Sequence, residues 1–282
     1  MLRIAAAALC LAVLGACDAP GNTEKSGPIS SATSFAEAAK AIASAEPAAP
    51  PPAAPPAMAA RSEAVDNDLI DFEYKYPATA GVIPALKTWL DADLAKQKRD
   101  LMAGAREGQK DAKESGFDFH PYGYWVEWKT VTDLPGWLSL SAEVSTYEGG
   151  AHPNHGFDAL VWDRQANKRI EPIAMFSSKQ ALSKAIRAPF CRALDAQRRE
   201  KRGGDGQLGT IDEFDQCIDP IDNGTLILGS TNRKAFDRIG VLVPPYNAGP
   251  YAEGSYEVTL PVTPGVLAAI RPEYRATFVA GR

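Results

Sequence analysis

Cysteine, histidine and long apolar segments are all scarce in this sequence. Its 282 residues include four cysteines and three histidines. The apolar run from Ala5 to Leu14 is too short for a transmembrane helix, which needs about 20 apolar residues. Because histidine is so rare, imidazole catalysis or zinc binding is restricted to one cluster, the His152-x-x-His155 motif.

Several motifs of common function classes are also missing. The chain has a net charge of −5 and shows no basic stripe, which argues against nucleic acid as a partner. It contains no Gly-x-Ser-x-Gly nucleophile elbow, no P-loop and no dinucleotide fingerprint. We therefore expect no cofactor and no enzyme activity. An envelope hydrolase stays an alternative, because catalytic carboxylates are paired in space rather than in sequence.

The first residues predict export and lipidation. A basic residue, the apolar run and Leu14-Gly15-Ala16-Cys17 form a secretory signal peptide over residues 1–16. The last four residues resemble the lipobox of bacterial lipoproteins, which implies that Cys17 is lipidated and anchors the chain to a membrane, facing the periplasm. Asp18 favours the inner membrane under the enteric sorting rule. The alternative is an ordinary secretory signal with a chance cysteine.

Residues 17–62 follow as an Ala- and Pro-rich segment. Such a segment carries too little apolar bulk to offset its ordering entropy, so we expect a disordered linker with polyproline character. It would hold a folded domain away from the membrane.

Two cysteines remain once the signal peptide is removed and Cys17 is lipidated. These are Cys191 and Cys217, and in an oxidising compartment they are expected to form one disulfide. The chain-entropy model assigns such a loop about 3–4 kcal/mol of stability. Two free buried thiols or a metal pair are the alternatives.

Apolar spacing in the remaining sequence predicts an α+β fold. Two long helices are expected over residues 82–112 and 178–199, and a short one after Pro264. Strands are expected over residues 68–76, 122–133, 138–144, 157–162, 225–228, 236–243 and 255–260. Strand runs around two long helices favour antiparallel sheets rather than alternating βαβ units, in two small subdomains, residues 63–164 and 165–282.

Two passages carry a family resemblance. They are Tyr147-Glu148-Gly149-Gly150-Ala151-His152-Pro153-Asn154 and the segment from Val243 to Gly254, Val-Pro-Pro-Tyr-Asn-Ala-Gly-Pro-Tyr-Ala-Glu-Gly. Together they resemble the paired extracytoplasmic domains of RsiV-type anti-sigma factors and PdaC-type peptidoglycan deacetylases, over about residues 65–272. The resemblance implies an α+β, non-catalytic domain pair in the cell envelope. In the anti-sigma factors the pair binds lysozyme, but neither the anti-sigma segment nor the deacetylase domain is found here, so lysozyme binding does not follow.

The candidate ligand-contact residues lie in these two passages. They are Tyr147, Gly149, Gly150, His152, Asn154, Tyr246 and Tyr251. The first alternative is structural, with the two glycines providing positive φ angles and His152 bonding loop backbone. The second is a zinc site of His152 and His155 with Glu148 and Asp158 nearby. We expect no metal, because Pro153 interrupts the regular element that usually aligns two such histidines.

The predicted hairpin is rich in aromatic residues. It contains Tyr122, Tyr124, Trp125, Trp128, Trp137 and Tyr147. About half should pack in the core, and the exposed remainder would form a platform for a glycan or a protein partner. We therefore expect a lipid-anchored binding or sensing module of the cell envelope, with a peptidoglycan-related glycan or a protein such as lysozyme as ligand. A structural or assembly lipoprotein is the alternative.

Overall fold

The computed structural model describes residues 60–204 and 214–282. The predicted signal peptide, the lipidation site Cys17 and most of the 17–62 linker lie outside the described residues. In the described part, no helix combines the length and apolar character that a membrane crossing requires.

Six strands form the first sheet, in the order β1-β2-β3-β4-β5-β6. Their bounds are β1 Arg61–Asp66, β2 Ile70–Tyr76, β3 Tyr122–Asp133, β4 Trp137–Tyr147, β5 Asn154–Asp163 and β6 Lys168–Ile170. All neighbours are antiparallel except β2 and β3, which are parallel. The chain crosses between these two through α2 (Ala78–Gly81) and α3 (Pro84–Ser115). The expectation of purely antiparallel sheets was therefore wrong at this one pair, because β2, α3 and β3 form a crossover unit.

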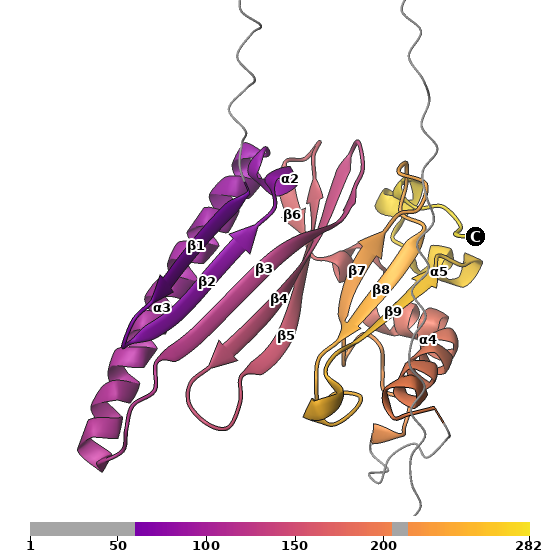
Figure 1. The fold of residues 1–282 in the computed structure, drawn as a ribbon. Helices are drawn as coiled ribbons and strands as arrows, with labels where there is room; N and C mark the ends of the chain where they lie inside the picture. Colours follow the sequence, from indigo (N-terminus) through magenta and orange to yellow (C-terminus); the bar gives the residue numbers. More distant parts are fainter. Residues whose placement is uncertain (1–59, 205–213) are drawn as a thin grey trace, which may run out of the picture. The chain divides into compact units, whose positions relative to one another are not determined.

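The long helix α3 covers one face of this sheet (Figure 1). Its buried residues Leu86, Leu90 and Leu94 recur every four positions, which places them on one side of the helix. Tyr74 of β2 lies beneath the helix and donates a hydrogen bond from its hydroxyl to Asp93, 2.8 Å away. Burial raises the pKa of Tyr74, so the phenol stays a neutral donor that also accepts from Trp128 Nε1 at 3.0 Å.

Three strands form the second sheet, in the order β7-β8-β9, all antiparallel. The bounds in this region are η1 Pro172–Met175, α4 Lys179–Lys201, β7 Thr225–Gly229, β8 Arg238–Val243, η3 Tyr251–Glu253, β9 Tyr256–Pro261, α5 Pro264–Ala269 and η4 Pro272–Thr277. Ser178 caps α4 by accepting a hydrogen bond from the amide of Ala181, 3.0 Å away. The mixed helix and strand content confirms the predicted α+β class.

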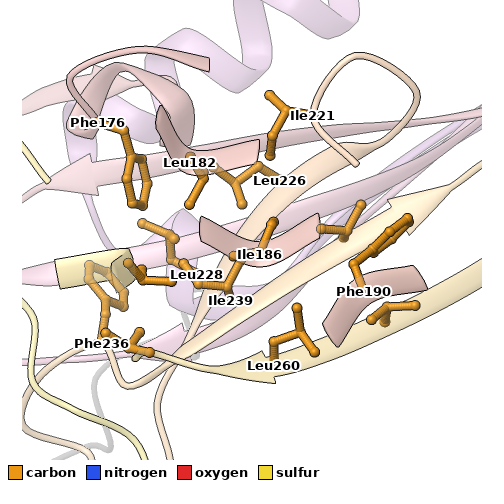
Figure 2. Close-up of a cluster of buried hydrophobic side chains, with 14 of the residues drawn as sticks. Phe176, Leu182, Ile186, Phe190, Ile221, Leu226, Leu228, Phe236, Ile239 and Leu260 are labelled. Carbon is orange, nitrogen blue, oxygen red and sulfur yellow. The ribbon is translucent and has the colours of Figure 1, made fainter. Parts of the chain in front are cut away.

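A hydrophobic core joins α4 to the second sheet (Figure 2). Leu182, Ile186 and Phe190 lie at four-residue intervals on the helix and are buried. They belong to the same cluster as Leu228 of β7 and Ile239 of β8. Burying each of these side chains contributes about 1.5–3 kcal/mol to stability.

Some element boundaries differ from the prediction. β1 begins at Arg61, so the last two residues of the predicted linker belong to a strand. β5 begins at Asn154, three positions before the predicted start at Phe157. The first sheet continues to Ile170, past the predicted subdomain boundary at residue 164. That division of the chain stays a prediction.

Candidate functional site

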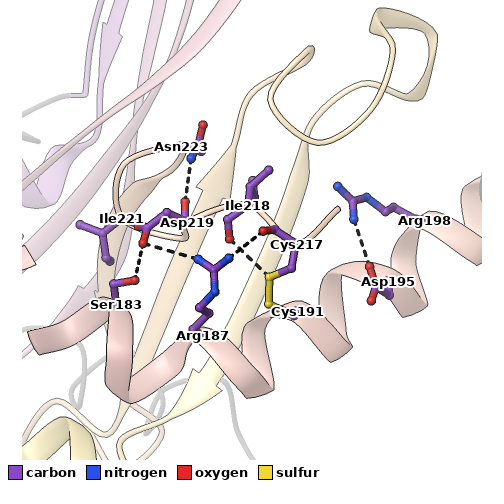
Figure 3. Close-up of a disulfide and its surroundings, with 10 residues drawn as sticks. All are labelled: Ser183, Arg187, Cys191, Asp195, Arg198, Cys217, Ile218, Asp219, Ile221 and Asn223. Carbon is purple, nitrogen blue, oxygen red and sulfur yellow. Dashed lines mark hydrogen bonds and ion pairs between the residues drawn. A yellow bond between two sulfur atoms is a disulfide. The ribbon is translucent and has the colours of Figure 1, made fainter. Parts of the chain in front are cut away.

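The disulfide attaches a loop to the middle of α4 (Figure 3). It joins Cys191 and Cys217, whose Cα atoms are 5.4 Å apart. One helical turn away, Arg187 donates to the carbonyl oxygen of Cys217 at 2.9 Å. Ser183 donates to the carboxylate of Asp219 at 2.5 Å. Three successive turns of α4 therefore hold the segment that leads into β7.

The end of α4 supports a second loop, residues 244–255 between β8 and β9. Arg198 is fully buried, and its Nε donates to the carbonyl oxygen of Ala248 at 2.9 Å. Its Nη1 forms an ion pair with Asp195 at 3.0 Å. Removing this arginine would leave the buried carbonyl of Ala248 without a partner, which costs about 1–3 kcal/mol.

An ion pair between Glu253 and Arg202 attaches the same loop to α4. Arg202 donates to both carboxylate oxygens of Glu253, at 2.7 and 3.2 Å, and Tyr256 donates a further hydrogen bond. Burial opposes the ionised form of Glu253, but these hydrogen bonds outweigh it and lower its pKa. Gly249 must lack a side chain, because a Cβ there would collide with the Glu253 carboxylate and the Tyr256 hydroxyl.

The β4–β5 loop forms the other half of the site. Gly149 and Gly150 have φ angles of 95° and 107°, a region that glycine enters at little cost. This agrees with the structural interpretation of the two glycines. The hydroxyl of Tyr147 donates to the carbonyl oxygen of Gly150 at 3.1 Å, which closes the turn before His152.

These two loops meet in a cluster of two histidines and two tyrosines. The imidazole of His152 stacks on the ring of Tyr251, with centroids 3.8 Å apart and planes inclined by 18°. Nε2 of His152 lies 3.1 Å from the hydroxyl of Tyr246, and Nε2 of His155 lies 2.9 Å from the hydroxyl of Tyr251. We call His152, His155, Tyr246 and Tyr251 the His–Tyr cluster.

Hydrogen bonding sets the orientation of both imidazole rings. Nδ1 of His152 lies 3.0 Å from the carbonyl oxygen of Pro153 and must donate, because a carbonyl only accepts. In the neutral ring, Nε2 then accepts from the Tyr246 hydroxyl. Nδ1 of His155 lies 2.7 Å from Oγ of Ser145, a residue of the neighbouring strand. Both rings are thus held in place by hydrogen bonds.

Tyr246 has an unusual backbone conformation. Its φ angle is 72°, in the left-handed region that non-glycine residues seldom adopt and that costs about 1–2 kcal/mol. The turn is stabilised by Asn247, whose side-chain amide donates to the carbonyl oxygen of Asn223 at 2.9 Å. Tyr246 nevertheless stays 53% exposed. Local strain of this kind is concentrated at functional sites.

Three residues considered for this site lie elsewhere. Asn154 pairs with Thr146 in the β4–β5 register, which places its side chain on the opposite face of the sheet from His155. Asp158 is also on that opposite face by strand alternation, and Glu148 lines a separate cavity beside Thr146. The carboxylates therefore do not converge on the imidazoles. In residues 60–204 and 214–282, no group of three or more His, Cys, Asp or Glu side chains is arranged to hold a metal ion.

The hairpin aromatics divide between the two faces of the sheet. Trp128 is buried under α3, and Tyr122 and Tyr124 pack against the same core. Trp125 alternates to the other face, opposite Ser145 in the register, and it is only half-buried. Sequence alternation separates the two sets, but the contact between Ser145 and His155 depends on pairing that the sequence does not reveal.

Two solved structures are similar to this chain at low sequence identity. A search of curated proteins finds no match. A DUF3298 family protein from Bacteroides fragilis is 15% identical, with 77% of this chain and 95% of that chain covered and a TM-score of 0.48. A DUF3298 family protein from Pseudomonas aeruginosa is 15% identical, with 79% and 95% covered and a TM-score of 0.43.

One family model matches part of the chain. Residues 63–155 match the model described as Deacetylase PdaC, which confirms the predicted resemblance to PdaC-type domains. The matched residues include Tyr147, His152 and His155 but not the loop that carries Tyr246 and Tyr251. Residues 63–155 of this chain are therefore similar to a PdaC-type domain.

Proposed function

We propose that this chain is a lipid-anchored binding module of the bacterial cell envelope and that its ligand is a peptidoglycan-related glycan. The observation that carries the proposal is the His–Tyr cluster. Two loops meet there, with His152 and Tyr246 lying 94 positions apart in the sequence, and the most exposed member, Tyr246, has a strained backbone. Partly exposed aromatic rings held in fixed positions are typical of binding surfaces.

The chemistry around His155 supports binding rather than catalysis. Ser145 and His155 are within hydrogen-bonding distance, as a nucleophile and its base would be. The other ring nitrogen of His155 faces the Tyr251 hydroxyl rather than the carboxylate that completes a serine–histidine–aspartate triad. A neutral phenol does not stabilise an imidazolium as a carboxylate does.

The family comparison supports a glycan as ligand. The matching model is named for a deacetylase, and the two sequence passages resemble domains found beside peptidoglycan deacetylase domains. A module of this type would hold cell-wall glycan close to the membrane through the Cys17 anchor. The net charge of −5 also suits a cationic protein such as lysozyme, which is the second candidate ligand.

Retention of the full-length protein on purified peptidoglycan sacculi tests the proposal. We expect saturable binding of the wild type, and at least a tenfold loss of affinity for His152→Ala and for Tyr246→Ala, equivalent to about 1.4 kcal/mol. The matched control is Phe117→Ala, because Phe117 is 76% exposed and follows α3, away from the cluster.

Three outcomes are informative. Loss of binding in both cluster variants, with Phe117→Ala unaffected, supports the proposal. Equal retention of all variants would contradict the assigned surface. If the sacculi retain no wild-type protein but immobilised lysozyme does, the ligand is a protein and the glycan proposal is wrong.

A further inference from the structure

A second candidate surface lies on the face of the first sheet opposite α3. At one end of this face, Val131, Phe157 and Ala159 are covered by Ile227 and Leu242 of the second sheet. Beyond that contact lies a cavity of about 240 Å³. Its lining residues are Glu73, Trp125, Val126, Glu127, Glu143 and Ser145.

The position of the Trp125 ring depends on the glycine at position 123. A Cβ atom at Gly123 would lie 2.0–2.6 Å from three atoms of the six-membered ring of Trp125. The indole therefore occupies the space beside Gly123 and lies along its own strand. In this position the half-buried ring forms one wall of the cavity and is available for stacking.

Two of the carboxylates around Trp125 are arranged in a way that lowers the stability of the fold. Glu127 and Glu143 are direct cross-strand partners, and like charges in that position are destabilising. Lys129 pairs with Glu127 at 3.0 Å, and Lys75 pairs with Glu73. Glu143 forms no ion pair within 4 Å in the described part of the chain, and its charge acts on Lys129 only at longer range. Side-chain arrangements that weaken the fold are expected at functional sites.

We infer that this surface binds the ammonium group of an amino sugar, in a glycan strand that carries free amines. An ammonium group near the face of a tryptophan gains a cation–π interaction, and a carboxylate such as Glu143 supplies a charge-assisted hydrogen bond. The inference rests on the proposed function, because it specifies which chemical group of the glycan this face of the sheet would bind.

The cavity adjoins the His–Tyr cluster through Ser145. Ser145 lines the cavity, and its hydroxyl contacts His155, which in turn contacts Tyr251. A glycan strand held by the cluster would therefore extend over β4 towards Trp125 on β3. Because Ser145 belongs to the cavity lining and also contacts the cluster, an extended glycan fits as the occupant better than an isolated lysine side chain of a protein.

Calorimetric titration of the full-length protein with two hexasaccharides tests the inference. One is a hexamer of β-1,4-linked glucosamine, and the other is the fully N-acetylated hexamer. We expect the wild type to bind the amine form at least tenfold more tightly. Glu143→Gln should reduce this preference to about threefold or less while leaving affinity for the acetylated hexamer nearly unchanged, and Trp125→Ala should weaken both.

The control variant is Glu148→Gln. Glu148 is also exposed but lines a different cavity, so its substitution removes the same charge without touching the proposed surface. If Glu148→Gln reduces the preference as much as Glu143→Gln, the attraction comes from net charge and the inference is overturned. Because Glu143 is exposed, its variant is expected to fold even if Trp125→Ala does not.

The remaining outcomes separate this inference from the proposed function. Equal affinity for the two hexamers, with binding still dependent on Tyr246, would overturn the amine preference and leave the glycan-binding function standing. Binding of neither hexamer nor sacculi would overturn both. Binding of lysozyme alone, lost in Glu143→Gln, would assign the surface to a protein and also overturn the inference.

Discussion

At the scale of single residues, the site depends on side chains held in costly positions. Tyr246 has a left-handed backbone, and His152 is fixed between a stacked tyrosine and a backbone carbonyl. Arg198 is fully buried beneath the loop that carries Tyr246. The left-handed backbone of Tyr246 and the buried guanidinium of Arg198 cost free energy, whereas stacking and hydrogen bonding stabilise the position of His152. Residues that a fold retains at such a cost are the best candidates for function.

The strain at Tyr246 leads to a stability prediction. Tyr246→Ala and Tyr246→Gly remove the same contacts with His152, but only glycine relieves the left-handed backbone, although its unfolded state is more flexible. We expect the glycine variant to be more stable than the alanine variant by about 1 kcal/mol. Urea unfolding monitored by tryptophan fluorescence would measure this difference, and equal or reversed stabilities would show that residue 246 is not strained.

At the scale of elements, α4 organises the site more than either loop does. Its middle turns hold the disulfide-linked segment, and its last turns hold residues 244–255 through Arg198, Lys201 and Arg202. Lys201 contributes a hydrogen bond of 2.6 Å to the carbonyl oxygen of Glu253. The loop with Tyr246 and Tyr251 is therefore held by helix side chains that lie outside the His–Tyr cluster.

The anchoring of this loop predicts a pH dependence of stability. Because the pKa of Glu253 is lowered in the folded state, its ionised form stabilises the fold fully above its ordinary pKa of 4.5, and this stabilisation is lost as the pH falls through the lowered value. We expect Glu253→Gln to be less stable than the wild type at pH 7 by about 1–3 kcal/mol.

The difference should shrink as the solution becomes acidic. Urea unfolding of both proteins at pH 7, 5, 4 and 3 would follow it, and the comparison cancels the contributions of other carboxylates. A difference that stays constant or grows towards pH 3 would mean that the carboxylate of Glu253 is not stabilised by Arg202.

Elements with strong periodicity were predictable from the sequence. Both long helices and the β3–β4 hairpin are present near their predicted bounds, because apolar spacing records which face is buried. β1 was missed because its inward-facing residues are only half-buried and most of them are charged. The parallel pairing of β2 and β3 was missed because sequence periodicity identifies strands but not their partners.

The candidate site was predictable only in part. Both loops were named from the sequence, yet nothing in the sequence shows that they meet. The assignment of Asn154 to the site assumed that it belongs to a loop. Once β5 begins at Asn154, strand alternation sends neighbouring side chains to opposite faces, so that only His155 faces the cluster.

At the scale of the whole molecule, the disulfide between Cys191 and Cys217 constrains the part of the chain that holds the Tyr246 loop. The disulfide joins residues 26 positions apart, and the loop that it closes leads directly to β7. Asn223 in this region accepts the hydrogen bond from Asn247, so the cross-link and the loop that carries Tyr246 are coupled through one short segment.

Removing the cross-link should lower the stability of the whole fold. For the double variant Cys191→Ser/Cys217→Ser, the chain-entropy model predicts a loss of about 3–4 kcal/mol in the free energy of unfolding. Urea unfolding of the oxidised wild type and the double variant, with the reduced wild type as control, would measure it. A loss below about 1 kcal/mol would show that the segment stays in place without the bond.

We propose that two loops far apart in the sequence act as one binding surface. The most direct test is a double-mutant cycle on peptidoglycan affinity in the full-length protein, with His152→Ala, Tyr246→Ala and the double variant. Because the two side chains contact each other, we predict a coupling energy of about 1 kcal/mol, within the range for residues in contact. Strictly additive effects, or wild-type affinity in either single variant, would contradict the claim.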